Sequence, residues 1–187
     1  MNLVDSLLDV QQVTLGKLIL VPKICQTDDL VQAAIDLLRV TAQDHRIALV
    51  THTDLISVWA DADCIVKVLT RLISNAITFS SANSTVWIVA EPINNLHVPG
   101  VQPAVRFQIR DQGQGITAPD LENIFEAFYQ VDTSSSNDSG NGLSLAICRG
   151  MIEQHGGRIW IESQLGVALP FLSPYLPRSR KQQNQLA

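Results

Sequence analysis

Apolar residues recur along most of the chain, with a spacing that alternates between helical and extended. Helical spacing predicts four helices, at Asn2 to Gly16, Thr27 to Thr41, Asp61 to Phe79 and Leu143 to His155. Apolar and β-branched runs predict six strands, at Lys17 to Ile24, Arg46 to Thr51, Ser57 to Ala60, Thr85 to Ala90, Val105 to Ile109 and Arg158 to Glu162. This order predicts an α+β fold, a two-layer α/β sandwich with helices on one face of a mixed sheet.

Two of these helices carry start signals and a defined apolar face. Thr27 is expected to cap the first of them, whose apolar face is predicted to be Leu30, Ala33, Ala34, Leu37, Leu38 and Thr41. Asp61 is expected to cap the next, whose apolar face is predicted to be Ile65, Val68, Leu69, Leu72, Ile73 and Ala76. Both helices are therefore expected to pack on the sheet.

Composition narrows the class of protein. With 187 residues and 46% hydrophobic content, the chain can form one domain with a full core. The net charge of -5 argues against nucleic acid as a partner, since basic residues cluster only at 178–181. Three widely spaced cysteines predict buried thiols in a reducing compartment, which favours the cytoplasm. No apolar run approaches the ~20 residues of a membrane span, so we expect no membrane contact.

Two glycine turns bracket a long polar loop and provide the candidate chemistry. Asp111 to Ile116 reads Asp-Gln-Gly-Gln-Gly-Ile, and Gly140 and Gly142 lead directly into the last predicted helix. Glycines allow a backbone to approach a ligand closely, and the N–H groups at a helix start attract phosphate. This pattern predicts a nucleotide pocket with a lid. Each turn taken alone is equally compatible with an ordinary acidic turn or a flexible loop before a helix.

Two polar side chains could serve such a pocket. The Asp111 carboxylate is placed to accept a hydrogen bond from a purine amino group. The amide oxygen of Asn75, one turn before Phe79, could coordinate Mg²⁺ between phosphates. For Asn75 alone, an amide satisfied by the backbone is the better interpretation.

In combination, four segments resemble the ATP-binding domain of sensor histidine kinases, which belongs to a wider group with gyrase, the Hsp90 chaperone and MutL. The segments are similar to the family's N, G1, F and G2 boxes in this order: Asp61 to Ser80, Asp111 to Ile116, Ile124 to Asp132 and Gly140 to Arg149. Val4 to Leu20 resembles the end of the second dimerisation helix, and the whole resemblance covers Val4 to about Gly166. It implies the histidine kinase ATPase (Bergerat) type of sandwich.

The resemblance also implies the ligands and their residues. ATP and Mg²⁺ would be the cofactors, with Asn75 as the metal ligand and Asp111 as the adenine-reading acid. The implied nucleotide-binding residues are Asn75, Asp111, Gly113, Gly115, Ile116, Gly140, Gly142 and Leu143. Phe125 and Phe128 would anchor the lid to the core. No catalytic residue is assigned, because in this family the phosphoryl acceptor is a histidine on a separate helical hairpin.

The chain departs from the family at the acceptor. None of its four histidines, His45, His52, His97 and His155, has the following acidic residue and proline that mark the family's acceptor. The expected partner is therefore a histidine-containing dimerisation domain or a response regulator in trans.

It departs also at the phosphate end. Arg71 replaces an Asn, Thr78 replaces a Lys or Arg, and Ser144 replaces a third Gly, while the lid carries Asp138 and no basic residue. Each lost charged contact is expected to weaken the free energy of phosphate binding by about 1.5–3 kcal/mol. Arg71 could compensate by reaching the phosphates, although a solvated or salt-bridged arginine is the better interpretation.

The C-terminal segment departs most. Beyond Val167 the family would continue with an alternating strand, whereas Ala168 to Pro177 holds three prolines and cannot be a paired central strand. Family-like codons read one base out of frame give the sequence of Ala168 to Leu176, so a shifted reading frame is one hypothesis for this segment. The predicted division is a remnant dimerisation helix at 1–16, the ATP-binding domain at 17–166 and an irregular tail at 167–187.

Three functions follow in order of preference. The first is a histidine kinase ATP-binding catalytic domain without its own acceptor, transferring phosphate only in trans. The second is a catalytically inactive nucleotide-binding or protein-interaction module. The third, a serine kinase of an anti-sigma factor, is disfavoured by the kinase-like segment Val4 to Leu20.

Overall fold

A computed structural model describes residues 3–16, 18–93, 104–131, 142–163 and 175–177. Its helices are α1 Leu3–Thr14, α2 Thr27–Asp44, α3 Ala62–Phe79, α4 Ala118–Asn123 and α5 Ser144–Gln154. Its strands are β1 Lys23–Gln26, β2 Ala48–Thr53, β3 Ser57–Ala60, β4 Thr85–Ile93, β5 Ala104–Arg110 and β6 Tyr175–Pro177. The segment 94–103 between β4 and β5 lies outside the described residues, as do Asp138 and Gly140.

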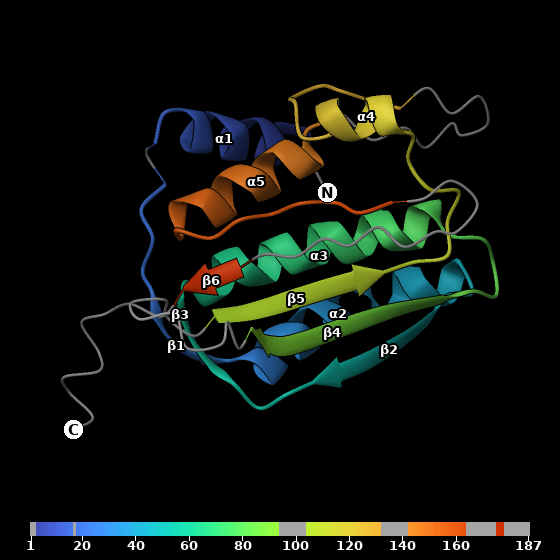
Figure 1. Ribbon diagram of the computed structural model, residues 1–187, viewed down its shortest axis with the longest axis horizontal. Helices are drawn as coiled ribbons and strands as arrows, with labels where there is room; N and C mark the ends of the chain where they lie inside the picture. Colours follow the sequence, from blue (N-terminus) through green and yellow to red (C-terminus); the bar gives the residue numbers. More distant parts are fainter. Residues whose placement is uncertain (1–2, 17, 94–103, 132–141, 164–174, 178–187) are drawn as a thin grey trace.

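The main sheet is mixed, as predicted. Its strand order is β2-β4-β5-β6, with β2 parallel to β4 and the other two pairs antiparallel. A separate antiparallel pair joins β1 to β3. Figure 1 shows α2 and α3 on one face of the main sheet, with α5 and then α1 continuing the helical layer. The two-layer α/β sandwich is therefore confirmed.

The core lies between that sheet and α3. Every residue of the predicted α3 face is buried, and Asp61 caps the helix by accepting a hydrogen bond from Cys64 N–H at 3.0 Å. On β4 and β5 the residues facing α3 alternate with outward ones, and Val86, Ile88, Phe107 and Ile109 are almost fully buried. A helical stripe and alternating strands meet here, which is how a one-sided core forms.

The predicted face of α2 is wrong in part. Leu37 is 67% exposed, and the buried face consists of Thr27, Leu30, Val31, Ala34, Leu38 and Ala42. Thr27 does not cap the helix: its hydroxyl donates to Asp54 O at 2.6 Å and accepts from Ile56 N–H. The loop between β2 and β3 thereby fixes the rotation of α2, and the apolar periodicity alone could not.

Several strand predictions also need correction. The stretch Lys17 to Ile24 contributes only the start of β1, and β2 and β3 pair with β4 and β1 and not with each other. No strand is assigned at Arg158 to Glu162, although Ile159 is buried and Ile161 packs on the core. Arg158 forms a β-bridge, but the segment has no strand of its own. The tail predicted as irregular contains β6, a three-residue strand at the sheet edge.

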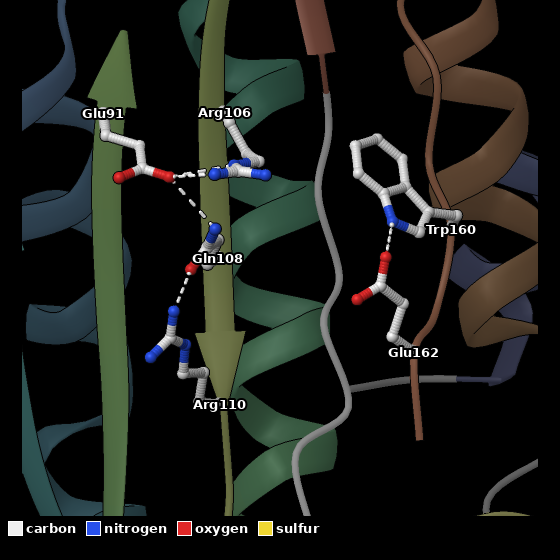
Figure 2. Close-up of polar contacts among 6 residues, drawn as sticks. All are labelled: Glu91, Arg106, Gln108, Arg110, Trp160 and Glu162. Atoms are coloured by element: carbon white, nitrogen blue, oxygen red, sulfur yellow. Dashed lines mark hydrogen bonds and ion pairs between the residues drawn. The ribbon is translucent and has the colours of Figure 1, made fainter. Parts of the chain in front are cut away.

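The face of the sheet opposite α3 is polar at its centre (Figure 2). Arg106 on β5 forms an ion pair with Glu91 on β4, and Gln108 donates to the same carboxylate at 3.1 Å. Arg110 donates to Gln108 Oε1 at 2.7 Å, so four side chains form one network along the two strands. Trp160 and Glu162 form a second contact nearby, at 3.1 Å.

The three cysteines are buried and unpaired, as predicted. Burial raises the pKa of the Cys64 and Cys148 thiols to about 12, so both remain protonated near neutral pH. Within the described part of the chain, no helix has both the length and the apolar character needed to cross a bilayer.

Candidate functional site

The candidate site lies where β5, the C-terminal half of α3 and the start of α5 come together. β5 ends at Arg110, and Asp111 follows at the edge of the core. Ser80, directly after α3, forms an isolated β-bridge with Gly113. The predicted acidic turn and the predicted Asn75 helix are therefore adjacent, as the pattern required.

Asp111 is buried and its charge is poorly compensated. Its side chain is 4% exposed, and Oδ1 accepts a hydrogen bond from Gly113 N–H at 2.8 Å. Among the described residues no Lys, Arg or His forms an ion pair with it. Desolvation raises the pKa of Asp111 to about 6, and the hydrogen bond from Gly113 only partly offsets that rise. A buried carboxyl with a strongly raised pKa at the edge of the core is a candidate for a ligand-binding group.

The turn after Asp111 contains two positions that favour glycine, one for lack of space and one for its backbone conformation. A Cβ on Gly113 would lie 2.5 Å from Phe79 O and 3.1 Å from Asp111 Oδ1. Gly115 has φ +77, a left-handed conformation that favours glycine. The Ile116 N–H donates to Ser163 Oγ at 2.8 Å, which ties the turn to the segment after α5. The turn is therefore joined to the end of α3 at Gly113 and to the segment after α5 at Ile116.

Gly142 connects the end of the lid to α5. It has φ +65, and a Cβ there would lie 2.7 Å from Phe128 C. Its carbonyl accepts a hydrogen bond from Phe128 N–H at 2.9 Å, and Leu143 behind it is fully buried. The start of α5, with Ser144 at its first position, is thereby fixed beside the site.

The lid segment contains a feature that sequence reasoning missed. Thr117 caps the short helix α4, and Asp120 accepts a hydrogen bond from Tyr129 O–H at 2.8 Å. The signal was present: Thr117-Ala118-Pro119-Asp120 has the spacing of a capping box with proline in the first turn. Ser163 was missed too, and no local pattern would have indicated its contact with Ile116.

Of the two phenylalanines expected to anchor the lid, one does so. Phe125 is partly buried and packs on the core, whereas the Phe128 side chain is 65% exposed. Phe128 instead contributes its backbone N–H to Gly142 and adopts φ +67. The prediction of an anchoring side chain is wrong for Phe128 because the backbone makes the contact.

The phosphate end is arranged as the substitutions suggested. Arg71 is buried and salt-bridged to Asp9 of α1 at 2.7 Å, and it is not solvated. Thr78 Oγ1 donates to Ser74 O at 2.9 Å within its own helix. In this structure neither side chain is committed to the site, so the backbone at the start of α5 and Asn75 are the polar groups left to serve it.

Asn75 fits a magnesium site of the kind that nucleotides complete. It is half-buried, on α3, and offers a neutral oxygen. No group of three or more His, Cys, Asp or Glu in the described ranges could hold a metal by itself. Mg²⁺ commonly takes one or two protein ligands together with substrate phosphates and water.

The family described as histidine kinase-, DNA gyrase B- and HSP90-like ATPase matches residues 60–175. A sensor histidine kinase of Pseudomonas protegens, GacS, is 33% identical over 186 residues, covering 96% of this chain and 20% of its own length. The chain thus spans about a fifth of that relative.

Solved structures agree in fold. The nucleotide-free catalytic domain of the histidine kinase ThkA superposes with a TM-score of 0.68 at 26% identity, covering 84% of this chain and 96% of that one. ThkA in complex with its response regulator TrrA gives 0.71 at 23% identity, with 96% and 49% covered.

Proposed function

This chain belongs to the family of histidine kinase-, DNA gyrase B- and HSP90-like ATPases, and from that premise we propose that it binds Mg-ATP as the catalytic domain of a two-component sensor histidine kinase. One observation carries the proposal: the buried Asp111 carboxyl, with a pKa of about 6, opens a turn packed against the helix that holds Asn75.

Each element of the site has a proposed role. Asp111 accepts a hydrogen bond from the adenine amino group. Gly113, Gly115 and Ile116 form the turn that faces the adenine ring. Asn75 holds Mg²⁺, which neutralises phosphate charge when bound. Gly142 and Leu143 lead into α5, whose first N–H groups would bind phosphate, and Gly140, which lies outside the described residues, is proposed to serve the same end of the site. In this chemistry the protein contributes position and charge stabilisation.

We propose that the phosphoryl acceptor is not one of this chain's own histidines. His155 is engaged in structure, since Nε2 accepts the Asp61 N–H at 3.2 Å and Nδ1 contacts Met151 O at 2.7 Å. His45 ends α2 and His52 lies on β2, the edge strand farthest from β5 and the turn. The acceptor would then be a histidine-containing dimerisation domain in trans, with a response regulator as the next partner. The ThkA–TrrA complex is a precedent for a partner of that kind on this fold.

A second candidate, an inactive nucleotide-binding or interaction module, is favoured by the commitment of Arg71 to Asp9 and of Thr78 to Ser74. These contacts leave the phosphate end with little positive charge. The adenine end is the same in both candidates, so they differ in turnover and not in recognition.

Calorimetric titration with Mg-ATP tests the proposal. Wild type is expected to bind with magnesium and more weakly with EDTA, and Asp111→Asn is expected to lose at least about tenfold in affinity, because a buried acceptor becomes partly a donor. Asp44→Asn, the same change at the exposed end of α2, is the matched control and should bind as wild type does. Equal binding by Asp111→Asn and wild type would refute the adenine role.

Transfer of labelled γ-phosphate to a supplied histidine hairpin separates the two candidates. Labelling of the hairpin supports the kinase, whereas binding without labelling supports the inactive module.

The division of the chain is also a proposal. We place a dimerisation-helix segment at 1–16, the nucleotide-binding domain at 17–166 and a tail at 167–187, supported by the end of α1 at Thr14, two residues before Gly16 with φ +60. The coding DNA tests the shifted-frame hypothesis for the tail. A neighbouring frame without a family-like strand would refute it.

A further inference from the structure

A buried ion pair joins α1 to α3 one helical turn before Asn75. Arg71 Nη2 lies 2.7 Å from Asp9 Oδ2, and the two side chains are only 3% and 14% exposed. Lys67 approaches the other Asp9 oxygen at 3.7 Å from a largely exposed position. Asp9 is therefore the carboxylate that neutralises a guanidinium inside the domain.

Arg71 is incompletely satisfied in this arrangement. A guanidinium has five N–H donors, and the buried Nε of Arg71 has no hydrogen-bond partner in the described structure. Buried polar atoms without a partner are uncommon, and each needs an explanation. A guanidinium whose donors match both carboxylate and phosphate can exchange one for the other.

The position of α1 is set by close packing as well as by charge. A Cβ on Gly150 of α5 would lie 1.8 Å from Val13 Cγ1, so α1 and α5 touch only because residue 150 is glycine. Gln154 Nε2 also donates to Val13 O at 3.3 Å. Figure 1 shows α1 lying along α5. Docking of α1 is thus a specific state, and it brings Asp9 to Arg71.

We propose that Asp9 on docked α1 and the phosphates of a bound nucleotide compete for Arg71. Arg71 and Asn75 are four residues apart, so their side chains lie on the same face of α3. Docking of α1 holds the guanidinium on Asp9, and release of α1 frees it for phosphate. The two events are then negatively coupled, and the coupling is reciprocal. This inference rests on the proposed nucleotide binding.

Asp9→Asn tests the competition through affinity. It removes the competing charge and is expected to tighten Mg-ATP binding about fivefold, within the usual range of coupling between sites. Arg71→Gln combined with Asp9→Asn should abolish the gain, because the guanidinium is the shared group. Asp36→Asn, which removes an exposed carboxylate paired with Arg39, is the matched control and should leave affinity unchanged.

Gly150→Ala tests the same competition without altering either charge. The added Cβ should displace α1 and tighten nucleotide binding as Asp9→Asn does, and Val13→Ala in the same chain should restore wild-type affinity by removing the clashing methyl. Hydrogen exchange of the α1 amides should rise in wild type when Mg-ATP binds, and it should rise less in Arg71→Gln.

If wild type binds Mg-ATP while Asp9→Asn and Gly150→Ala bind equally well or more weakly, the competition is overturned and the nucleotide site stands. If wild type binds no Mg-ATP, the proposed function fails and the competition fails with it. The two failures are therefore distinguishable.

Discussion

Two carboxylates of this chain, the partly buried Asp9 on α1 and the buried Asp111 after β5, are held in opposite ways. Asp9 faces a guanidinium at 2.7 Å, whereas Asp111 accepts a backbone N–H and has no ion-pair partner among the described residues. Desolvation dominates at Asp111 and raises its pKa to about 6. The ion pair with Arg71 compensates the burial of the Asp9 carboxylate, whereas no ion pair among the described residues compensates the burial of Asp111.

The presence or absence of an ion-pair partner distinguishes a carboxylate that stabilises the fold from one that is available to bind a ligand. A paired buried carboxylate fixes how two helices meet, and removing it leaves a buried positive charge. An unpaired one costs stability near neutral pH, and that cost is retained where a ligand's donor completes the hydrogen bonding. We therefore expect substitutions at Asp9 and Asp111 to change stability with opposite signs.

The largest effect is expected at the paired site. Asp9→Asn should lower the free energy of unfolding by about 2–3 kcal/mol, because Arg71 stays buried without a carboxylate. Replacing both partners, Asp9→Leu with Arg71→Met, should recover most of the loss, since apolar groups of similar size need no pairing. Urea unfolding monitored by tryptophan fluorescence measures both. A single variant as stable as wild type would break the comparison.

An intermediate effect is expected where the backbone holds Asp111 in place. Gly113→Ala should cost about 2 kcal/mol, because its Cβ would lie 2.5 Å from Phe79 O and the clash is with backbone. Gly16→Ala is the matched control: it has φ +60 but nothing within 4 Å, so only the backbone strain of about 1 kcal/mol applies. Thermal unfolding should rank the two variants in that order. Equal losses would mean that the turn is not packed tightly against α3.

The sequence predicts the unpaired site better than the paired one. Asp111, its glycines and the α3 face are local patterns, and the predicted α3 stripe is buried residue for residue. The partner of Arg71 is 62 positions away on a helix whose docking no periodicity encodes. Solvation or a salt bridge was expected for Arg71, but the sequence pattern did not identify Asp9 as its ion-pair partner. The predicted buried face of α2 was partly wrong for the same reason, because the Thr27 side chain is held by Asp54 and Ile56 and not by its own helix.

The smallest effect is expected in stability at Asp111 itself, and its sign is the sharpest test of the comparison. The pKa of Asp111 is raised on folding from its ordinary value of 3.8 to about 6, so the folded chain holds this proton more tightly than the unfolded one. Stability from this group is full below about pH 3.8 and is lost as the pH rises through about 6. Asp111→Asn never ionises, so it avoids an ionisation cost of at most about 3 kcal/mol at pH 7.5. Its buried amide NH₂ group offsets part of that gain, because it replaces a carboxylate oxygen and needs an acceptor, and a net gain of about 1 kcal/mol is expected. The advantage should shrink as the pH falls toward 4, because wild-type Asp111 is then protonated in the folded state.

Urea titrations at pH 7.5 and 4.5 measure the difference, with Asp44→Asn as an exposed control that should show no comparable gain. A loss of stability in Asp111→Asn at pH 7.5 would mean that the carboxylate is compensated in the folded chain, and Asp9 and Asp111 would then belong to one class.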